Sequence, residues 1–215
     1  MDKLEHYGIR GPPLELLSSY LTNRKQYVCL QDTRSSLIEI HQGVPQGSIL
    51  GPLLFLIYIN DIHTCLTAGD IYLYADDSTI FFSGTNIDLI ASNTNHDLMC
   101  LNNWLLANKL SLNASKTTYC IFSVPQKQLA SYPDIHINGT LITCTDKVKY
   151  LGVTLDKHLS WKDHIKPISS KINVLSYLFS KVRYIVPLRI LYLLYYALAY
   201  PHLIYCIEVW GHLSK

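Results

Sequence analysis

The hydrophobic residues of this chain recur with two different periods, and the change of period predicts where helices and strands lie. Helical spacing marks residues 4–21, with a break at the glycine and two prolines of 11–13. It returns over residues 87–108, where one apolar side would face a core, and again from residue 161 onward. These stretches predict a broken helix at the start, a long helix near the middle and a helical C-terminal part.

Shorter apolar or alternating stretches, bounded by turn residues, predict strands between these helices. They cover residues 26–31, 36–41, 71–82, 118–124, 135–142 and 150–155. A turn is expected at 32–34, and an Asn-Gly pair at 138–139 is typical of a hairpin. Helices and strands in this order indicate an α+β fold.

Two adjacent acids, Asp76 and Asp77, stand in the middle of the hairpin predicted at 71–82. Two like charges side by side repel each other, and apolar neighbours would lower the local dielectric constant and strengthen that repulsion. A divalent cation would remove the repulsion, and Mg²⁺ is usually held by one or two carboxylates together with substrate phosphates. The pair therefore indicates metal-assisted phosphoryl or nucleotidyl transfer, although Asp-Asp-Ser is also common in ordinary turns.

A glycine-containing loop precedes an apolar helix that is expected to end near residue 62. Residues 43–52 of this region read Gly-Val-Pro-Gln-Gly-Ser-Ile-Leu-Gly-Pro. Glycine lets the backbone approach a ligand closely, Ser48 is a suitable N-cap, and Pro52 is tolerated in the first helical turn. A helix N-terminus beside such a loop can bind phosphate or nucleic acid, but many helices begin in this way.

Together, the loop at 43–47 and the Tyr-Ala-Asp-Asp turn at 74–77 resemble two motifs of the reverse-transcriptase family, in its non-LTR (LINE-like) branch. Further segments are similar to the same family in the same order. They are an Asn-x-x-Lys-Thr segment at 113–117, a hairpin at 148–156 similar to the primer grip, and thumb-like segments at 200–205 and 210–211. Because these motifs follow one another along nearly the whole chain, their combination is far more specific than any one of them.

The resemblance implies a partial polymerase palm at residues 1–156, built as an antiparallel sheet with packed helices, and a partial helical thumb at residues 157–215. It implies the activity of an RNA-directed DNA polymerase acting on an RNA template, a DNA primer and deoxynucleoside triphosphates (dNTPs). The implied cofactor is Mg²⁺, with Mn²⁺ able to replace it, and the implied chemistry is two-metal nucleotidyl transfer.

The same resemblance assigns roles to residues around the paired acids. Asp76 and Asp77 are expected to be catalytic and to ligate the metal, with Asp76 the firmer ligand. Tyr74 and Ala75 would line the nucleotide or template site, where a small side chain at 75 keeps the primer end accessible. Lys116 is expected near the triphosphate, where it would neutralise or protonate the leaving group; outside that role it is an ordinary solvated lysine.

Two further pairs of residues receive binding roles from the resemblance. Gln46 and Gly47 would contact the template base or the incoming nucleotide, with Gly47 permitting close backbone approach. Leu151 and Gly152 would shape the primer grip, with Gly152 allowing a tight hairpin turn.

One carboxylate of the family's metal site has no counterpart in this sequence. The family places another aspartate on a palm strand upstream of the glycine-containing loop, shortly before a helix similar to residues 3–11. Asp2 does not replace it, since it precedes a helical Lys-Leu pattern and lacks an apolar strand. We therefore expect an N-terminally truncated reverse transcriptase, without fingers and with little activity alone. The alternatives are a non-catalytic, nucleic-acid-binding retrotransposon remnant and an inert fragment that folds poorly.

Composition changes this interpretation only modestly. The net charge is +2 and 16% of the residues are charged, so the surface as a whole is not strongly basic. Basic residues cluster between 147 and 183, which fits a primer–template face and equally a solvated helix face. The six cysteines are widely spaced and form no zinc-binding pattern, so buried thiols in a reducing compartment are expected.

The stretch 188–210 is nearly apolar enough for a membrane span. Arg189, Glu208 and the interruption at Pro201 favour instead a thumb helix that is buried and broken near Pro201. The N-terminus has the character of neither a signal peptide nor a transit peptide. We expect a nuclear or cytoplasmic location, neither secreted nor in a membrane.

Overall fold

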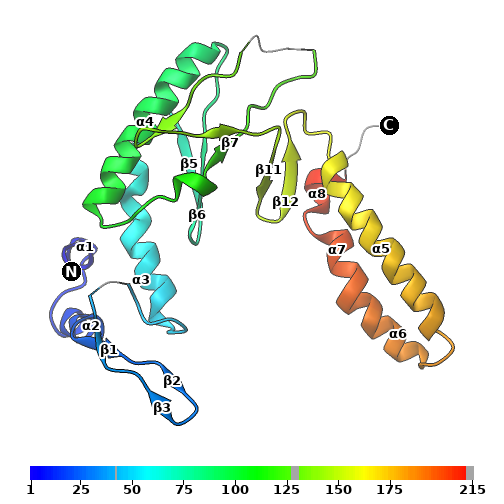
Figure 1. Cartoon of the computed structure of the whole chain (residues 1–215), viewed down its shortest axis with the longest axis horizontal. Helices are drawn as coiled ribbons and strands as arrows, with labels where there is room; N and C mark the ends of the chain where they lie inside the picture. The colour runs from blue at the N-terminus through cyan, green and yellow to red at the C-terminus, as the bar shows by residue number, and fades with distance from the viewer. Residues whose placement is uncertain (42, 127–130, 212–215) are drawn as a thin grey trace. The chain divides into compact units, whose positions relative to one another are not determined.

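The computed structural model describes residues 1–41, 43–126 and 131–211 (Figure 1). Residues 42 and 127–130 of the predicted palm, and 212–215 of the predicted thumb, lie outside these ranges. The chain forms two compact units, Met1–Ser111 and Leu112–Lys215. Both units combine helices with small sheets, which confirms the α+β class, while the division into palm and thumb at residue 156 stays a prediction.

The first unit alternates helices with hairpins. Its helices are α1 (Asp2–His6), α2 (Pro12–Leu21), α3 (Leu50–Ile59), the 3₁₀ helix η1 (Asn60–Cys65) and α4 (Ile87–Ala107). Its strands are β1 (Arg24–Gln26), β2 (Cys29–Leu30), β3 (Thr33–Arg34), β4 (Ile38–Ile40), β5 (Asp70–Tyr74) and β6 (Asp77–Phe81). Strand β1 pairs antiparallel with β4, β2 with β3, and β5 with β6. The broken first helix and the long middle helix are thus confirmed.

Local chemistry explains where the long helix α4 begins and which side it buries. The Asn86 side chain accepts hydrogen bonds from the backbone N–H groups of Asp88 and Leu89, which satisfies two donors that a helix start leaves free. Along the helix, Leu101 and Leu105 are buried one turn apart, as an amphipathic helix requires. The core of this unit also contains Leu4, Leu54, Ile59, Ile62 and Leu98.

The hairpin between α2 and α3 differs in detail from the prediction. Its pairing register runs from Arg24 opposite Ile40 to Leu30 opposite Thr33, so the turn is made by residues 31–32 instead of 32–34. Gln31 adopts a positive φ of 53°, which closes this two-residue turn. Sequence patterns fix strand boundaries less firmly than the existence of the hairpin, because turn geometry sets the register.

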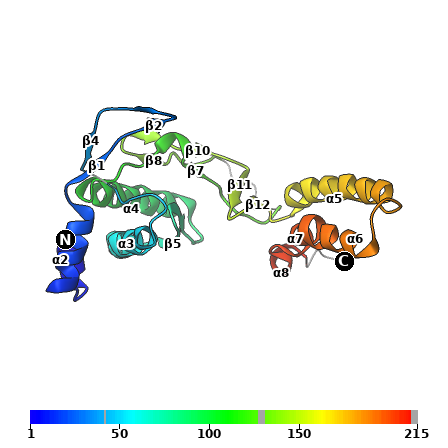
Figure 2. The same ribbon diagram turned by 90° about the horizontal axis from the view of Figure 1, so that it is seen from below.

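The second unit begins with short strands and ends in helices. Its strands are β7 (Thr118–Tyr119), β8 (His136–Ile137), β9 (Thr140–Leu141), β10 (Thr143–Cys144), β11 (Lys147–Tyr150) and β12 (Val153–Asp156). Its helical segments are η2 (Ala114–Lys116), α5 (Lys162–Val182), α6 (Leu188–Leu194), the π-helical turn η3 (Tyr195–Ala199), α7 (Tyr200–Ile204) and α8 (Ile207–Trp210). Figures 1 and 2 both show α5 lying alongside α6 and α7.

The sheets of the second unit are smaller than expected. The strand predicted at 118–124 is only two residues long, and it pairs in parallel with β10. The predicted hairpins β8–β9 and β11–β12 are both present and antiparallel. In the part of the chain that the structure describes, every sheet has two strands, so the continuous antiparallel sheet of a palm is not seen.

The C-terminal helices are not interrupted at Pro201 in the way that the sequence suggested. Pro201 occupies the first turn of α7, where a missing N–H does no harm. The irregularity comes just before it, where the Tyr200 N–H donates to the carbonyl of Tyr195 in a π-helical turn. Among the described residues, every helix is too short or too polar to cross a membrane.

Candidate active site

The paired acids lie at the turn of the β5–β6 hairpin, as the sequence predicts. The register pairs Asp70 with Phe81 at one end and Tyr74 with Asp77 at the other, which leaves Ala75 and Asp76 as a two-residue turn. Ala75 has a φ of 51°, the left-handed conformation that a two-residue hairpin turn requires. The turn therefore holds both carboxylates at the tip of a short, tightly closed ribbon.

Both carboxylates are open to solvent. Asp76 and Asp77 are exposed, and neither forms an ion pair with any described residue. The expectation that apolar strand residues surround them with a low dielectric is wrong, because these residues do not enclose the turn: even Tyr74, the last residue of β5, is 64% exposed. Carboxylate oxygens are the ligands that Mg²⁺ prefers, so this pair fits the implied metal in donor type.

The two acids of the turn are not joined by a third metal-binding side chain among the described residues. Across residues 1–41, 43–126 and 131–211, no group of three or more His, Cys, Asp or Glu side chains is close enough to hold a metal ion. The hairpin turn thus supplies two carboxylates, and the remaining coordination positions of an octahedral Mg²⁺ would be filled by other ligands.

The glycine-containing loop is held at both ends by hydrogen bonds. At its start, the Arg24 guanidinium of β1 donates to the carbonyl of Gly43 at 2.5 Å. At its end, the Ser48 hydroxyl accepts a hydrogen bond from the Gly51 N–H at 3.0 Å, so Ser48 caps helix α3 as predicted, although the helix is assigned from Leu50 onward. Between these anchors Gln46 and Gly47 are exposed, and Gly47 has a positive φ of 74°.

Replacing Gly51 with alanine is expected to cost about 1 kcal/mol through loss of this cap, set against a gain of up to about 1 kcal/mol because alanine favours the helix more than glycine does. A Cβ atom at residue 51 would lie 2.9 Å from the Ser48 hydroxyl and force it away. Urea-induced unfolding would measure the change. In a Ser48→Ala background the cap is already lost, so Gly51→Ala should there stabilise the unit by its helix propensity alone. Equal effects in both backgrounds would contradict the capping role.

The loop and the hairpin both belong to the first unit. In Figure 1 the turn of the β5–β6 hairpin points toward the side of the unit where helix α3 begins. None of the side-chain hydrogen bonds or ion pairs that connect described residues joins the turn at 75–76 to the loop residues Gln46 or Gly47. The structure therefore presents the turn and the loop as two exposed elements of one unit.

An aspartate that the sequence interpretation missed lies at the base of this hairpin. Asp97 of α4 is fully buried, with an exposed fraction of 0%. Its Oδ1 accepts hydrogen bonds from the Thr67 N–H at 3.0 Å and the Thr67 hydroxyl at 2.7 Å, and its Oδ2 accepts from the N–H groups of Ala68 and Gly69, both at 2.9 Å. Although burial acts to raise the pKa of Asp97, these hydrogen bonds outweigh it and the pKa is lowered.

A signal for Asp97 was present in the sequence. It occupies the same helical face as Leu101 and Leu105, four and eight residues later, and both leucines are buried. A charged residue on a core-facing position must find hydrogen-bond partners, because an unpaired buried charge is very unfavourable. An acid inside an apolar stripe therefore indicates a structural clamp, meaning a buried carboxylate that holds another segment through hydrogen bonds.

The other predicted site residues belong to the second unit. Lys116 ends η2 and is exposed. Leu151 and Gly152 form the two-residue turn between β11 and β12, with φ values of 45° and 85°, so the tight turn expected at Gly152 is confirmed. The Tyr205 hydroxyl donates to the Leu151 carbonyl at 2.5 Å, and a Cβ on residue 152 would lie 3.3 Å from the Tyr205 ring. The tip of this hairpin is therefore packed against the segment between α7 and α8.

A second carboxylate organises the connection from this hairpin to helix α5. Asp156, the last residue of β12, accepts hydrogen bonds from the N–H groups of His158, Ser160 and Trp161 at 3.3, 3.1 and 3.0 Å. Burial acts to raise the pKa of Asp156, but these backbone donors hold it below its usual value. Trp161 has a left-handed φ of 61° immediately before α5, so Asp156 fixes an irregular turn that local preference alone would not select.

A buried histidine completes the packing of α5. His164 Nδ1 accepts a hydrogen bond from the Thr154 N–H of β12 at 3.3 Å, and its ring meets Trp210 of α8 edge to face at 5.5 Å between centroids. Accepting at Nδ1 requires the neutral ring, and burial lowers the pKa of His164 accordingly. The histidine thus joins the hairpin, α5 and α8 in the second unit.

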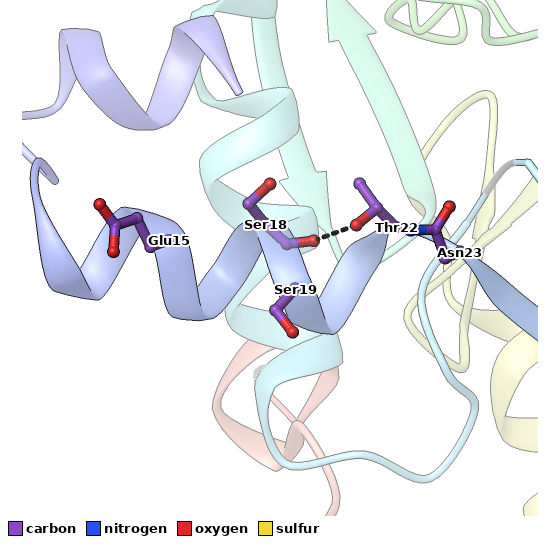
Figure 3. Close-up of a pocket in the computed structure, with 5 residues that line it drawn as sticks. All are labelled: Glu15, Ser18, Ser19, Thr22 and Asn23. Carbon is purple, nitrogen blue, oxygen red and sulfur yellow. Dashed lines mark hydrogen bonds between the residues drawn. The ribbon is translucent and has the colours of Figure 1, made fainter.

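A polar depression of about 610 Å³ lies elsewhere, along helix α2. Figure 3 shows its lining residues, Glu15, Ser18, Ser19, Thr22 and Asn23, on one helical face and its end. The Thr22 hydroxyl donates to the Ser18 carbonyl at 2.8 Å, so it is satisfied within the helix. None of the nine predicted site residues lines this depression.

Comparison with known proteins agrees with the motifs. The family described as reverse transcriptase (RNA-dependent DNA polymerase) matches residues 1–155. The chain is 31% identical over 217 residues to the RNA-directed DNA polymerase from mobile element jockey of Drosophila funebris, covering 94% of this chain and 23% of that protein. It is 28% identical over 217 residues to a probable RNA-directed DNA polymerase from transposon BS of Drosophila melanogaster, covering 95% of this chain and 24% of that protein.

These relatives are much longer than the chain. A second jockey polymerase, from Drosophila melanogaster, is 30% identical over 211 residues, with 93% of this chain and 23% of that protein covered. The chain therefore spans about a quarter of the length of the curated relatives that it matches. No solved structure matches it. Since the family match covers well over half of the chain, the chain belongs to the reverse transcriptase family, in the branch of non-LTR (LINE-like) retrotransposons.

Proposed function

We propose that this chain supplies the catalytic hairpin of an RNA-directed DNA polymerase. The observation that carries the proposal is the β5–β6 turn, which exposes Asp76 and Asp77 side by side at the tip of a closed ribbon. Two adjacent carboxylates without an ion-pair partner among the described residues repel each other, and a divalent cation relieves that repulsion. The left-handed φ of Ala75 closes this two-residue turn, as the positive φ of Gln31 and Leu151 does in two other hairpins.

Asp76 and Asp77 would hold Mg²⁺, which Mn²⁺ could replace. In two-metal transfer, one ion held there would supply activation of the primer 3′-hydroxyl and a second would supply neutralisation of the leaving pyrophosphate. The small side chain of Ala75 leaves the approach to the carboxylates open, and Tyr74 presents an exposed ring beside them. An exposed aromatic ring is suited to stacking on a base or sugar.

The remaining predicted residues would bind the nucleic acid and the nucleotide. Gln46 and Gly47, both exposed on the loop before α3, would contact the template base or the incoming dNTP. Lys116 would neutralise the triphosphate, and its exposed ammonium group is free of ion pairs among the described residues. Leu151 and Gly152 would contact the primer, on a turn that Tyr205 supports from behind.

The chain would be divided into palm and thumb as in other members of the family. Residues 1–156 would form part of a palm and residues 157–215 part of a helical thumb, acting on an RNA template, a DNA primer and dNTPs in the nucleus or cytoplasm. The helical character of the C-terminal part supports the thumb assignment. The two-stranded sheets of the described residues would be joined by further strands in a complete palm.

We expect residues 1–215 alone to extend a DNA primer on an RNA template only at background level. With two carboxylates in place of three, the rate should fall by about 10²–10⁴, the usual effect of losing one strong transition-state contact. Primer extension with Mg²⁺ or Mn²⁺ measures this directly, and robust synthesis would contradict it. Salt-sensitive RNA binding that is insensitive to Mg²⁺ and to Asp76→Asn would favour the alternative of a non-catalytic binding protein.

The metal assignment has its own test, which requires no catalysis. Asp76→Asn is expected to weaken Mn²⁺ binding at least about tenfold, or 1.4 kcal/mol, since it removes one of two charged ligands. Paramagnetic broadening of the amide signals around the turn would report the affinity. Asp70→Asn, at the other end of the same strand and also exposed, is the matched control and should leave the titration unchanged. Equal titrations for both variants would refute the assignment.

A further inference from the structure

Three consecutive backbone amides immediately before strand β5 converge on one buried carboxylate. Thr67, Ala68 and Gly69 each donate an N–H to Asp97 at 2.9–3.0 Å, and β5 begins at the next residue. Four hydrogen bonds to an ionised, fully buried acid form a strong and directional attachment. The start of the hairpin is therefore fixed to helix α4.

The other strand of the hairpin meets the same turn. A Cβ atom on Gly69 would lie 2.6 Å from Cε1 of Phe82 and 2.8 Å from Cγ2 of Ile80. Only glycine permits this approach, so Ile80 of β6 and Phe82, just after the strand, pack directly on the turn that Asp97 holds. Both strands of the hairpin are thus secured at their base.

The rest of the hairpin has few other supports. A two-stranded ribbon is marginally stable by itself, and the side chains of Tyr72, Leu73, Tyr74 and Phe81 are exposed. The tip lies about 20 Å beyond Gly69 at the usual rise of a strand, so a rotation of about 3° at the base would move the acids by about 1 Å. A displacement of this size is enough to lower a catalytic rate about a hundredfold.

We propose that Asp97 is the positioning residue of the catalytic hairpin: by holding residues 67–69 against α4, it sets the direction in which Asp76 and Asp77 are presented. The name "catalytic" for this hairpin rests on the function proposed above. The clamp itself is a property of the first unit, and it is measured without nucleic acid, metal or turnover.

The test is the order of the hairpin relative to helix α4 in the full chain. Residual dipolar couplings of backbone amides would be recorded in β5, β6 and α4. In the wild type, one alignment tensor should fit all three elements. In Asp97→Asn, the amide that replaces one oxygen can no longer accept from two of the donors, so we expect the couplings of β5 and β6 to shrink relative to those of α4. Because these couplings scale with the order parameter S, a reduction of about a sixth or more would match the difference between rigid and flexible backbone.

Two further variants keep the outcome decisive. Asp88→Asn makes the same chemical change at an exposed position of the same helix and should leave all couplings unchanged. Thr67→Val removes only the hydroxyl donor, so it gives a folded comparison if Asp97→Asn unfolds, with a smaller change in the same direction expected. Hairpin couplings that still fit the α4 tensor in every folded variant would overturn the proposal. That result would leave the metal titration of Asp76 unaffected, so the two ideas fail separately.

Discussion

Replacing Asp97 with alanine is expected to lower the free energy of unfolding of the first unit by about 3–5 kcal/mol, since buried donors lose a charged acceptor and a cavity remains. The change removes the acceptor of four hydrogen bonds from a side chain with no solvent exposure. Because the chain has two compact units, hydrogen exchange of peptides from residues 1–111 in increasing urea would isolate the effect.

The matched control is Asp88→Ala, which removes an exposed acid from the first turn of the same helix. An exposed substitution of this kind should change stability by about 0.5 kcal/mol or a little more, owing to the helix dipole. If Asp97→Ala and Asp88→Ala had similar effects, Asp97 would not be a clamp.

The same residue gives the stability of the first unit a definite dependence on pH. The pKa of Asp97 is lowered in the folded chain, so the unfolded chain binds its proton first as pH falls. The stabilisation that the ionised Asp97 carboxylate gives to the fold is therefore complete above its pKa in the unfolded chain, about 3.9. It decreases as pH falls below that value toward the pKa of Asp97 in the folded chain. The difference between wild type and Asp97→Ala should shrink over that acidic range and stay constant near neutrality.

Asp156→Ala should destabilise the second unit by about 2–3 kcal/mol, because three backbone N–H groups lose their shared acceptor. His158, Ser160 and Trp161 form the irregular turn between β12 and α5, and Asp156 is the acceptor that holds it. Hydrogen exchange of peptides from residues 112–215 would measure the loss, and protection should fall first at the start of α5.

An exposed ion pair of the same unit provides the comparison. Asp163 lies 3.7 Å from Lys147 with both side chains largely exposed, and such pairs contribute only about 0.2–1 kcal/mol. Asp163→Ala should therefore have a clearly smaller effect than Asp156→Ala. The reverse order would show that the ion pair, and not the backbone acceptor, joins the β11–β12 hairpin to α5.

These two acids have a common physical role. The carboxylates of Asp97 and Asp156 each accept hydrogen bonds from several backbone N–H groups that are close together in the sequence. Each of these segments adjoins a hairpin that carries predicted site residues. Asp76 and Asp77, in contrast, are left exposed at a turn. Acids that accept several backbone hydrogen bonds hold those segments in place, while exposed acids without protein partners are available to a ligand.

The sequence by itself determined the family, the paired acids and the kinds of element that carry them. The Asn-Gly pair, the glycine before β12 and the amphipathic face of α4 each follow from local preference, so the hairpins at 136–141 and 147–156 and the helix at 87–107 were predictable. The motifs at 43–47 and 74–77 identified the reverse transcriptase family because their residues and order are specific.

Tertiary structure alone decided how the elements are secured. The partners of Asp97 lie about thirty residues earlier in the chain, and no local pattern states which amides a buried acid will meet. The π-helical turn before Pro201 and the packing of Tyr205 on Leu151 likewise depend on contacts between distant segments. Local periodicity reports which side of an element is apolar, whereas the pairing of buried polar groups is set only when the segments pack together.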